Sequence, residues 1–374
     1  MGWNIAFFGS SLVSSYWNGA ATYYRGIVKA LAARGHRVTF YEPDAYQRQQ
    51  HRDISDPPWA RVVVYQAEDE RGVRAALDEA SDADVVIKAS GVGVFDALLE
   101  HAVLAHQRRG AQVVFWDVDA PATLDRLHQD ARDPFHSAVP EYDLILTYGG
   151  GDAVVRAYHA LGARRCVPIY NALDPEEHHP VPHDERFSGL LGFMASRLPD
   201  REARVEEFFF NAARRLPDAR FVLGGTGWSD RALPANVHSV GHVFTRDHNA
   251  FNVSPRAILN VNRDSMARYG FSPPTRIFEA AGAGACIVTD RWEGIELFLA
   301  PEREILVAGS GEELAEQLAG LDPERAARIG EAAQRAVLAK HTYAQRVLQL
   351  EAALSVHAPP LRAADLAGEG QVAP

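Results

Sequence analysis

Short apolar runs alternate with longer amphipathic stretches along the first half of the chain. Residues 5–9 form one such run, and residues 20–34 show the apolar spacing of a helix that ends at Gly35. The alternation predicts a parallel sheet, and because each run ends in small or polar residues, those loops should share one edge of it. Strands are predicted in this half at residues 5–9, 37–41, 61–65, 84–89, 112–116 and 143–147.

A second alternating block begins after a stretch rich in proline, histidine and acidic residues. That stretch, residues 171–187, predicts a linker, in which the adjacent His178 and His179 are expected to be solvated and not to hold a metal. Beyond it, strands are predicted at residues 189–195, 219–224, 237–240, 257–261, 286–288 and 304–307, and helices at residues 202–214, 311–319 and onward to about residue 358.

Together these patterns predict an α/β protein with two Rossmann-like domains that face each other across a cleft. The first domain would span residues 1–180 and the second residues 186–340. Residues 341–358 would form a helix that packs back on the first domain, and residues 359–374 a disordered tail.

Length and composition agree with this architecture. A chain of 374 residues is long enough for two cores, and 47% hydrophobic and 23% charged residues are typical of a globular protein. The formal charge of −11 argues against nucleic acid as a partner. No apolar run reaches the length of a transmembrane segment, and the first residues lack a basic leader, so a cytoplasmic protein is expected. Cys166 and Cys286 are too few for a disulfide framework or a zinc site, which agrees with a reducing compartment.

The most informative stretch is residues 276–290. It predicts a helix that opens after two prolines, a glycine-rich helix end, and a buried strand that ends at Asp290. Such a unit places Arg276 and Glu279 at a helix N-terminus on the carboxyl side of the sheet, where α/β proteins bind anions and nucleotides. The alternative is an ordinary α/β unit with a charged surface.

Other loops of the second half would point into the same cleft. Arg197 and Arg201 could reach the two phosphates of a nucleotide diphosphate, and Glu279 could accept hydrogen bonds from the hydroxyls of a ribose. Each arginine is equally well explained as a solvated helix charge, so the evidence is their convergence at one edge. The candidate catalytic residues here are Arg201 and Arg276, and the candidate donor-binding residues are Arg197, Gly225, Thr226, Asn262, Arg263, Arg276 and Glu279.

Residues 276–290, followed by residues 294–298 and 310–314, resemble the C-terminal domain of GT-B glycosyltransferases. The resemblance is closest to the CgeB-like group, which is related to glycosyltransferase family 4. Residues 194–197 are similar to the phosphate-contacting loop of that group, and residues 116–121 resemble a Trp/Asp/Pro strand end in its N-terminal domain.

The resemblance implies a hexosyltransferase that moves a sugar from a nucleotide-diphosphate sugar of the UDP, dTDP or GDP type, without a metal or another cofactor. It implies that Glu279 binds the ribose, and it adds Gly294 and Ile295 to the donor site. Family 4 enzymes carry a second glutamate near the donor sugar, and Phe271 occupies that position here. Neighbouring cationic and amide groups would then have to compensate.

The first domain supplies candidates for the acceptor side. Asp117 and Asp119 form a D-x-D pair, which binds a divalent metal in GT-A enzymes, whereas GT-B enzymes are generally metal-independent. Asp119 is interpreted as a catalytic candidate facing the acceptor, either as the general base of an inverting reaction or as an acceptor of backbone hydrogen bonds where the loop starts. The loop after the first strand could bind the acceptor, with core packing as the alternative for its aromatic residues; the candidates are Ser10, Ser11, Tyr16, Trp17 and Asn18.

Three other functions stay open at this point. A nucleotide-sugar epimerase and a non-catalytic nucleotide-sugar-binding protein would share the fold. An NAD-dependent dehydrogenase is less favoured, because residues 9–14 lack the G-x-G-x-x-G pattern and residues 91–93 carry only a fragment of it. The expected partners are a nucleotide sugar and a small-molecule, glycan or protein acceptor.

Overall fold

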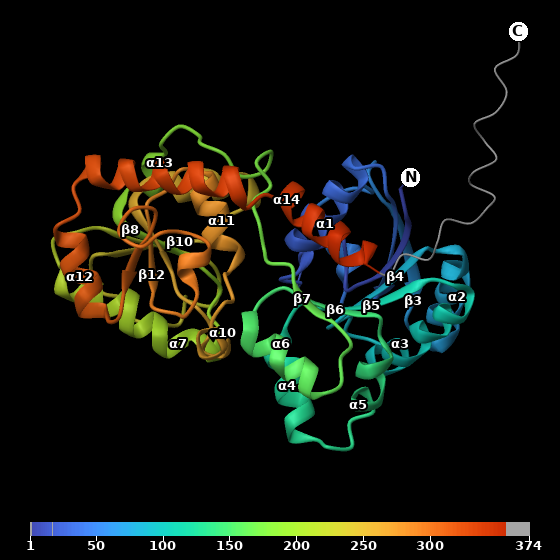
Figure 1. Ribbon diagram of the computed structural model, residues 1–374. Helices are drawn as coiled ribbons and strands as arrows, with labels where there is room; N and C mark the ends of the chain where they lie inside the picture. Colours follow the sequence, from blue (N-terminus) through green and yellow to red (C-terminus); the bar gives the residue numbers. More distant parts are fainter. Residues whose placement is uncertain (1, 17, 357–374) are drawn as a thin grey trace, which may run out of the picture.

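Two parallel sheets, one in each half of the chain, form the framework of the protein (Figure 1). The computed structural model describes residues 2–16 and 18–356. The first sheet has seven strands in the order β3-β2-β1-β4-β5-β6-β7, and the second has six in the order β10-β9-β8-β11-β12-β13. This confirms the predicted α/β architecture of two Rossmann-like domains.

The first domain contains the strands β1 (Asn4–Phe8), β2 (Arg37–Asp44), β3 (Arg61–Gln66), β4 (Val85–Ala89), β5 (Gln112–Asp117), β6 (Leu144–Thr147) and β7 (Cys166–Pro168). Its helices are α1 (Ala21–Ala33), α2 (Glu70–Glu79), α3 (Asp96–Ala102), α4 (Ala120–Gln129), α5 (Phe135–Ala138) and α6 (Gly151–Ala160).

The second domain contains the strands β8 (Gly189–Met194), β9 (Phe221–Gly224), β10 (Val237–Gly241), β11 (Pro255–Asn260), β12 (Ile287–Asp290) and β13 (Leu306–Ala308). The helices of this half are α7 (Pro199–Val205), α8 (Asn211–Arg215), α9 (His248–Val253), α10 (Asp264–Tyr269), α11 (Thr275–Gly282), α12 (Gly311–Ala319), α13 (Pro323–Lys340) and α14 (Tyr343–Ser355). None of the helices in the described part of the chain is long and apolar enough to cross a membrane.

Three of the differences from the sequence-based expectations have a clear physical reason. The strand predicted to end at residue 41 continues to Asp44, because β2 leaves β1 after Tyr41 but stays paired with β3. The short edge strand β7 was not predicted, since three residues carry too little pattern. The helix predicted at residues 202–214 starts at Pro199 and contains a π-helical turn at Glu206–Phe210 between α7 and α8.

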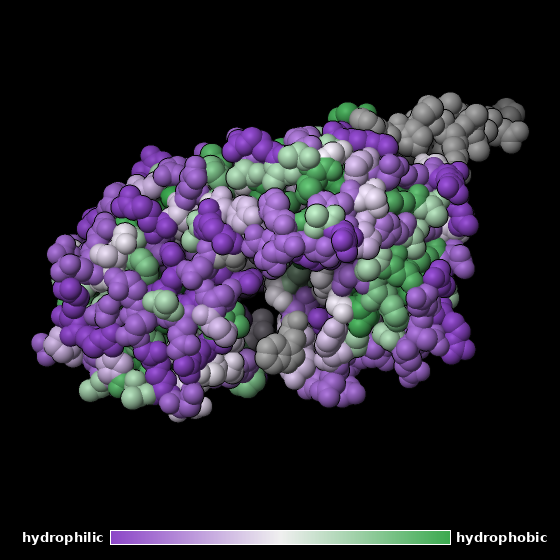
Figure 2. All heavy atoms as spheres, turned by 90° about the horizontal axis from the view of Figure 1, so that it is seen from below, coloured by the Kyte–Doolittle hydropathy of each residue, from purple (hydrophilic) through white to green (hydrophobic). Residues whose placement is uncertain are grey.

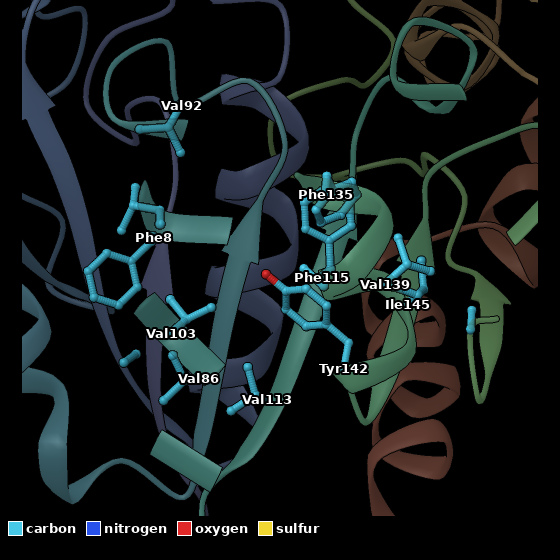
Figure 3. Packing of buried hydrophobic residues seen from close by; sticks show 14 of the residues in the cluster. Phe8, Val86, Val92, Val103, Val113, Phe115, Phe135, Val139, Tyr142 and Ile145 are labelled. Atoms are coloured by element: carbon cyan, nitrogen blue, oxygen red, sulfur yellow. The ribbon is translucent and has the colours of Figure 1, made fainter. Parts of the chain in front are cut away.

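Apolar side chains pack on both faces of each sheet, as expected for parallel strands covered by helices. Figure 3 shows part of one cluster in the first domain, where Phe8, Phe115 and Tyr142 lie between the sheet and its helices. The Tyr142 hydroxyl donates a hydrogen bond of 2.7 Å to the backbone carbonyl of Glu100 on α3. The core therefore holds helix α3 in place, and with it the charged residue Glu100.

The strand order reverses at the same place in both sheets, next to the first strand of each domain. These points lie between β1 and β4 and between β8 and β11. Open α/β sheets bind ligands outside the carboxyl ends of the strands at such a point. The described parts of the loops after these four strands are residues 9–16 and 18–20, 90–95, 195–198 and 261–263.

Two segments connect the domains side by side. The backbone N–H of Leu173 donates to His341 O at 2.8 Å, and that of Tyr343 donates to Leu173 O at 3.1 Å. Helix α14 then packs on α1 in the first domain (Figure 1). The buried Arg346 donates to the carbonyl of Asn171 at 3.2 Å and to Nδ1 of His341 at 2.9 Å. The crossing is therefore tied by buried polar contacts.

The expectation for the linker is wrong at one residue. His178 is buried, and its Nε2 lies 3.9 Å from Oε1 of Glu279, whereas a solvated position was expected. The reason is tertiary: Leu173 and the His178 backbone pack against Gly282, where an added Cβ would lie 2.3 Å from Leu173 Cδ1. The linker thus covers helix α11. The tail expected at residues 359–374, and the last residues of the expected final helix, lie outside the described residues.

Candidate active site

A cavity of about 520 Å³ opens at the carboxyl edge of the first sheet, where the second domain faces it. Figure 2 shows the hollow between the two halves of the molecule. Its lining comes mainly from the loops after β1, β4, β5 and β6 and from helices α3 and α4. Arg263, Met266 and Ser272 complete it from the second domain.

Three arginines of the second domain lie close enough to affect one another electrostatically. Burial lowers the pKa of Arg201 to about 10, and the nearby cations Arg276 and Arg263 act in the same direction. Burial also lowers the pKa of Arg276. Nε of Arg201 and Nη1 of Arg276 are buried and have no hydrogen-bond partner within the described residues. Arg201 does donate from Nη2 to Ser196 O at 2.8 Å, but buried donors that lack a partner are costly, so an anion bound here would stabilise the site.

Glu279 lies one helical turn after Arg276 on α11. Its side chain is 15% exposed and near the Arg276 guanidinium, with His178 as its closest ion-pair partner at 3.9 Å. The carboxylate accepts no hydrogen bond from the residues that the structure describes, which leaves it available to hydroxyl donors. His248 on α9 lies near the same carboxylate, and burial lowers its pKa although Glu279 opposes the change.

Arg263 connects the donor half to the cavity of the first domain. Its Nε donates to Asp200 Oδ2 at 2.5 Å, and its Nη1 lies 3.6 Å from Asp119 Oδ2. Burial opposes the charge, but the hydrogen bond to Asp200 and the nearby Asp119 raise the Arg263 pKa above its ordinary value.

Asp117 and Asp119 have different surroundings although they are two residues apart. Asp117 is completely buried and accepts hydrogen bonds from Ser90 Oγ at 2.8 Å, from Asp119 N at 3.0 Å and from the Tyr158 hydroxyl. Burial raises its pKa. Asp119 precedes α4 without capping it, and its side chain is 42% exposed at the cavity. The backbone-binding role considered for Asp119 therefore belongs to Asp117.

The loop after β1 is only partly directed at the cavity. Ser10 and Asn18 line it, and Ser10 Oγ donates to Asn18 Oδ1 at 2.8 Å. Ser11 is fully buried and donates to Glu42 Oε1 at 2.9 Å, so it does not face the cavity. Tyr16 stacks on His51 and is not part of the lining. Trp17 lies outside the described residues.

Arg197 is separated from the arginine cluster by its own partners. Its guanidinium donates to Glu202 at 2.5 Å and to Asp230 at 3.0 Å. The loop beside it is closely packed: Arg197 N donates to Thr226 O at 2.9 Å, and a Cβ on Gly225 would lie 2.1 Å from Ala195 O. Gly225 also has φ +113°, so only glycine fits there without strain.

Asn262 is held by the buried end of β12. Its backbone N–H donates to the Asp290 carboxylate at 3.2 Å, and Asp290 also forms a buried ion pair with Arg204. The side-chain Nδ2 of Asn262 is buried without a partner in the described chain. It is therefore a further unused donor beside Arg263.

Comparisons with known proteins agree with this geometry. Residues 201–352 match a family model described as "Glycosyl transferase-like". Among solved structures, Anabaena HepE in complex with UDP and glucose is similar with a TM-score of 0.67 and 14% identity, covering 95% of this chain and 100% of that one. The chain has the GT-B fold of glycosyltransferases.

Two further GT-B structures show the same likeness. Sucrose-phosphate synthase from Thermosynechococcus elongatus has a TM-score of 0.66 and 14% identity, covering 94% of this chain and 98% of that one. An α-glucosyltransferase in complex with UDP-glucose and DNA containing an abasic site has a TM-score of 0.68 and 12% identity, covering 95% and 100%. No curated protein sequence gives a significant match. The CgeB-like grouping stays a prediction.

Within the GT-B cleft, Phe271 forms a contact between the domains. It has φ +45°, its N–H donates to Glu293 O at 2.6 Å, and its carbonyl accepts from Gly150 N at 2.9 Å. An added Cβ would lie 2.6 Å from its ring at Gly151 and 2.2 Å at Gly294. The ring thus fills space that two glycines leave free on opposite domains. The adjacent Ile295 is 2% exposed and packs in the core.

The GT-B site therefore contains some predicted residues and omits others. Arg201, Arg263 and Arg276 come together beside Glu279, and Asp119, Ser10 and Asn18 reach the cavity. His178 and His248 near Glu279 were missed, as were Glu100, Arg126 and Tyr24 in the cavity lining. No local signal marks these five residues, because each reaches the site through the tertiary fold.

Proposed function

We propose that the protein is a glycosyltransferase that transfers a sugar from a nucleotide-diphosphate sugar to an acceptor held by the first domain. The observation that carries the proposal is the pair of buried guanidinium groups, Arg201 and Arg276, with unused donors next to the available carboxylate of Glu279. A nucleoside diphosphate matches this arrangement, because its phosphates are anionic and its ribose carries hydroxyl donors.

The leaving diphosphate would develop negative charge as the glycosidic bond breaks. Arg201, Arg276 and Arg263 would stabilise that charge through fixed guanidinium donors in a partly dry site. UDP in complex with HepE and UDP-glucose in complex with the α-glucosyltransferase support a donor of this class. The arginines supply the positive charge that a metal ion would otherwise provide, so we propose a metal-independent reaction.

Asp119 would act on the acceptor side. Its exposed carboxylate lies in the cavity and 3.6 Å from Arg263, which is part of the donor cluster. In an inverting reaction it would take the proton from the attacking hydroxyl as the new bond forms. Closure of the two domains would exclude water, which would otherwise hydrolyse the donor. The buried free thiols Cys166 and Cys286 fit a cytoplasmic protein.

Calorimetric titration with UDP, dTDP, GDP and NAD is the first test. We expect micromolar binding of at least one nucleoside diphosphate in the presence of EDTA, and binding at least tenfold weaker in Glu279→Gln. Release of the same diphosphate from its sugar conjugates, with formation of a new glycoside, would then establish transfer. Tight NAD binding without nucleoside-diphosphate binding would overturn the proposal.

A further inference from the structure

The cavity of the first domain differs chemically from the arginine cluster. We infer that it binds an uncharged, polyhydroxylated acceptor, such as a saccharide unit, in preference to a phosphorylated or lipid acceptor. This inference rests on the proposed function and deepens it by naming the acceptor class. Its basis is the balance of charge around the cavity, the hydrogen-bonding groups that line it, and the rigidity of those groups.

The charged groups that line the cavity balance one another. The carboxylates are Asp96, Glu100 and Asp119, and the guanidinium groups are Arg48, Arg126 and Arg263. Arg126 lies 3.2 Å from Glu100 and 3.1 Å from Asp133, and Arg263 contacts Asp119 and Asp200. A phosphate here would meet three carboxylates, whereas Arg201 and Arg276 of the second domain form no ion pair with any carboxylate that the structure describes, although Glu279 lies near Arg276.

The same lining offers hydrogen-bond donors and acceptors side by side. Arg126 can donate and Glu100 can accept, from helices α4 and α3 respectively. Tyr24 also belongs to the lining, with its hydroxyl buried near the Ser10 side chain. Ser10 and Asn18 also line the cavity, and Asn18 is held in place by Ser10 Oγ and by the carbonyls of Ser11 and Ser14. Sugar hydroxyls both donate and accept, so they match such mixed pairs.

The carboxylates of Asp96 and Glu100 are held in place by a buried residue of the sheet. Lys88 on β4 is completely buried, with Nζ 2.6 Å from Asp96 and 3.8 Å from Glu100. Asp96 also accepts from the backbone N–H groups of Val92 at 3.1 Å and Gly93 at 2.8 Å. A polar site that is already ordered loses little entropy when it binds a small rigid ligand.

The apolar part of the cavity lining consists mainly of small side chains, among them Ala20, Val118 and Pro121. Large apolar side chains that are exposed in the described structure include Phe244, Leu297 and Leu348, and none of these exposed residues lines the cavity. The volume of about 520 Å³ lies in the range of small-molecule sites. A lipid-linked acceptor would have to keep its chain outside the cavity.

The test compares matched acceptors with the wild-type protein. Methyl glycosides of common hexoses and their 6-phosphates are supplied with the nucleotide sugar that binds, and transfer is followed by mass spectrometry. We expect kcat/KM for at least one methyl glycoside to exceed that of its phosphate by tenfold or more. Preference for the phosphate, or transfer only to a lipid-linked acceptor, would overturn the inference.

A variant separates the acceptor site from the donor site. Glu100→Gln leaves Arg126 with less compensation, so KM for the neutral acceptor should rise about tenfold and discrimination against the phosphate should shrink, with UDP affinity unchanged. Glu312→Gln is the matched control, because Glu312 pairs with Arg215 at 2.9 Å on the surface of the second domain. An unchanged KM in Glu100→Gln would overturn the inference while the proposed function stands; loss of donor binding in the wild type would overturn both.

Discussion

Replacing Arg276 with methionine should weaken nucleotide binding while leaving the unliganded protein at least as stable. The substitution keeps most of the side-chain length but removes a guanidinium that is buried next to Arg201, with Nη1 unpaired in the described structure. An unsatisfied buried donor costs about 1–3 kcal/mol. Removing it should therefore raise the free energy of unfolding by up to that amount, less the attraction between Arg276 and the nearby Glu279 carboxylate.

The effect on the complex has the opposite sign. A hydrogen bond from a charged group contributes about 1.5–3 kcal/mol, and tenfold in the dissociation constant corresponds to about 1.4 kcal/mol. Loss of the Arg276 contact to a phosphate should therefore weaken UDP binding about 10- to 150-fold. The nucleotide would in consequence raise the unfolding temperature of the variant less than that of the wild type.

Isothermal titration with UDP and chemical denaturation with and without UDP measure both quantities. Arg197→Met is the matched control, because Glu202 and Asp230 already compensate that guanidinium. The control should bind UDP within about threefold of the wild type. Equal losses in the two variants, or wild-type affinity in Arg276→Met, would refute the assignment of the arginine cluster to the phosphates.

Three further substitutions test other parts of the structure. Asp119→Asn should lower kcat about 100-fold or more in steady-state kinetics, with UDP affinity unchanged. An unaltered kcat would exclude Asp119 as the general base. Burial lowers the His341 pKa from 6.5 to about 4, and the nearby cations Arg346 and Lys340 act in the same direction. Because the unfolded chain then binds the proton more tightly than the folded protein, the free energy of unfolding should decrease as the pH falls from about 6.5 to 4. His341 should contribute about 3 kcal/mol to that decrease. In His341→Gln, whose amide can still accept a hydrogen bond from Arg346, the free energy of unfolding from chemical denaturation should therefore depend less on pH over the same range. Phe271→Ala should loosen the domain contact and increase the radius of gyration in small-angle scattering; an unchanged profile would count against the contact.

The sheets could be predicted from the sequence because the sequences of buried parallel strands are short apolar runs. The same logic placed Arg276 in the first turn of α11, with Glu279 one turn further along the helix. It could not separate Arg197 from Arg201, because both lie close to acidic residues in the sequence and only the fold shows that Glu202 and Asp230 pair with Arg197. Such pairings are decided by the tertiary fold and leave no local pattern.

The acceptor side shows the same limit. Asp117 and Asp119 look equivalent in the sequence, but the last residue of β5 is buried against Tyr158 while the residue before α4 is exposed. The histidine-rich linker has the composition of a solvated segment, yet His178 packs beside Glu279. Composition describes what a segment tolerates on average and does not report which of its residues meets another domain.

The contact around Phe271 has a consequence for how related sequences can diverge. The ring fits because Gly151 of the first domain and Gly294 of the second both lack a side chain, and a Cβ on either would overlap it. Both glycines also have positive φ, +47° at Gly151 and +89° at Gly294, so a larger residue at either position would be strained even without the ring. Glycine should therefore persist at both positions among homologues, whichever residue stands at the position of Phe271. A substitution at that one position can then change the contact from polar to aromatic, because the space on both domains is already present.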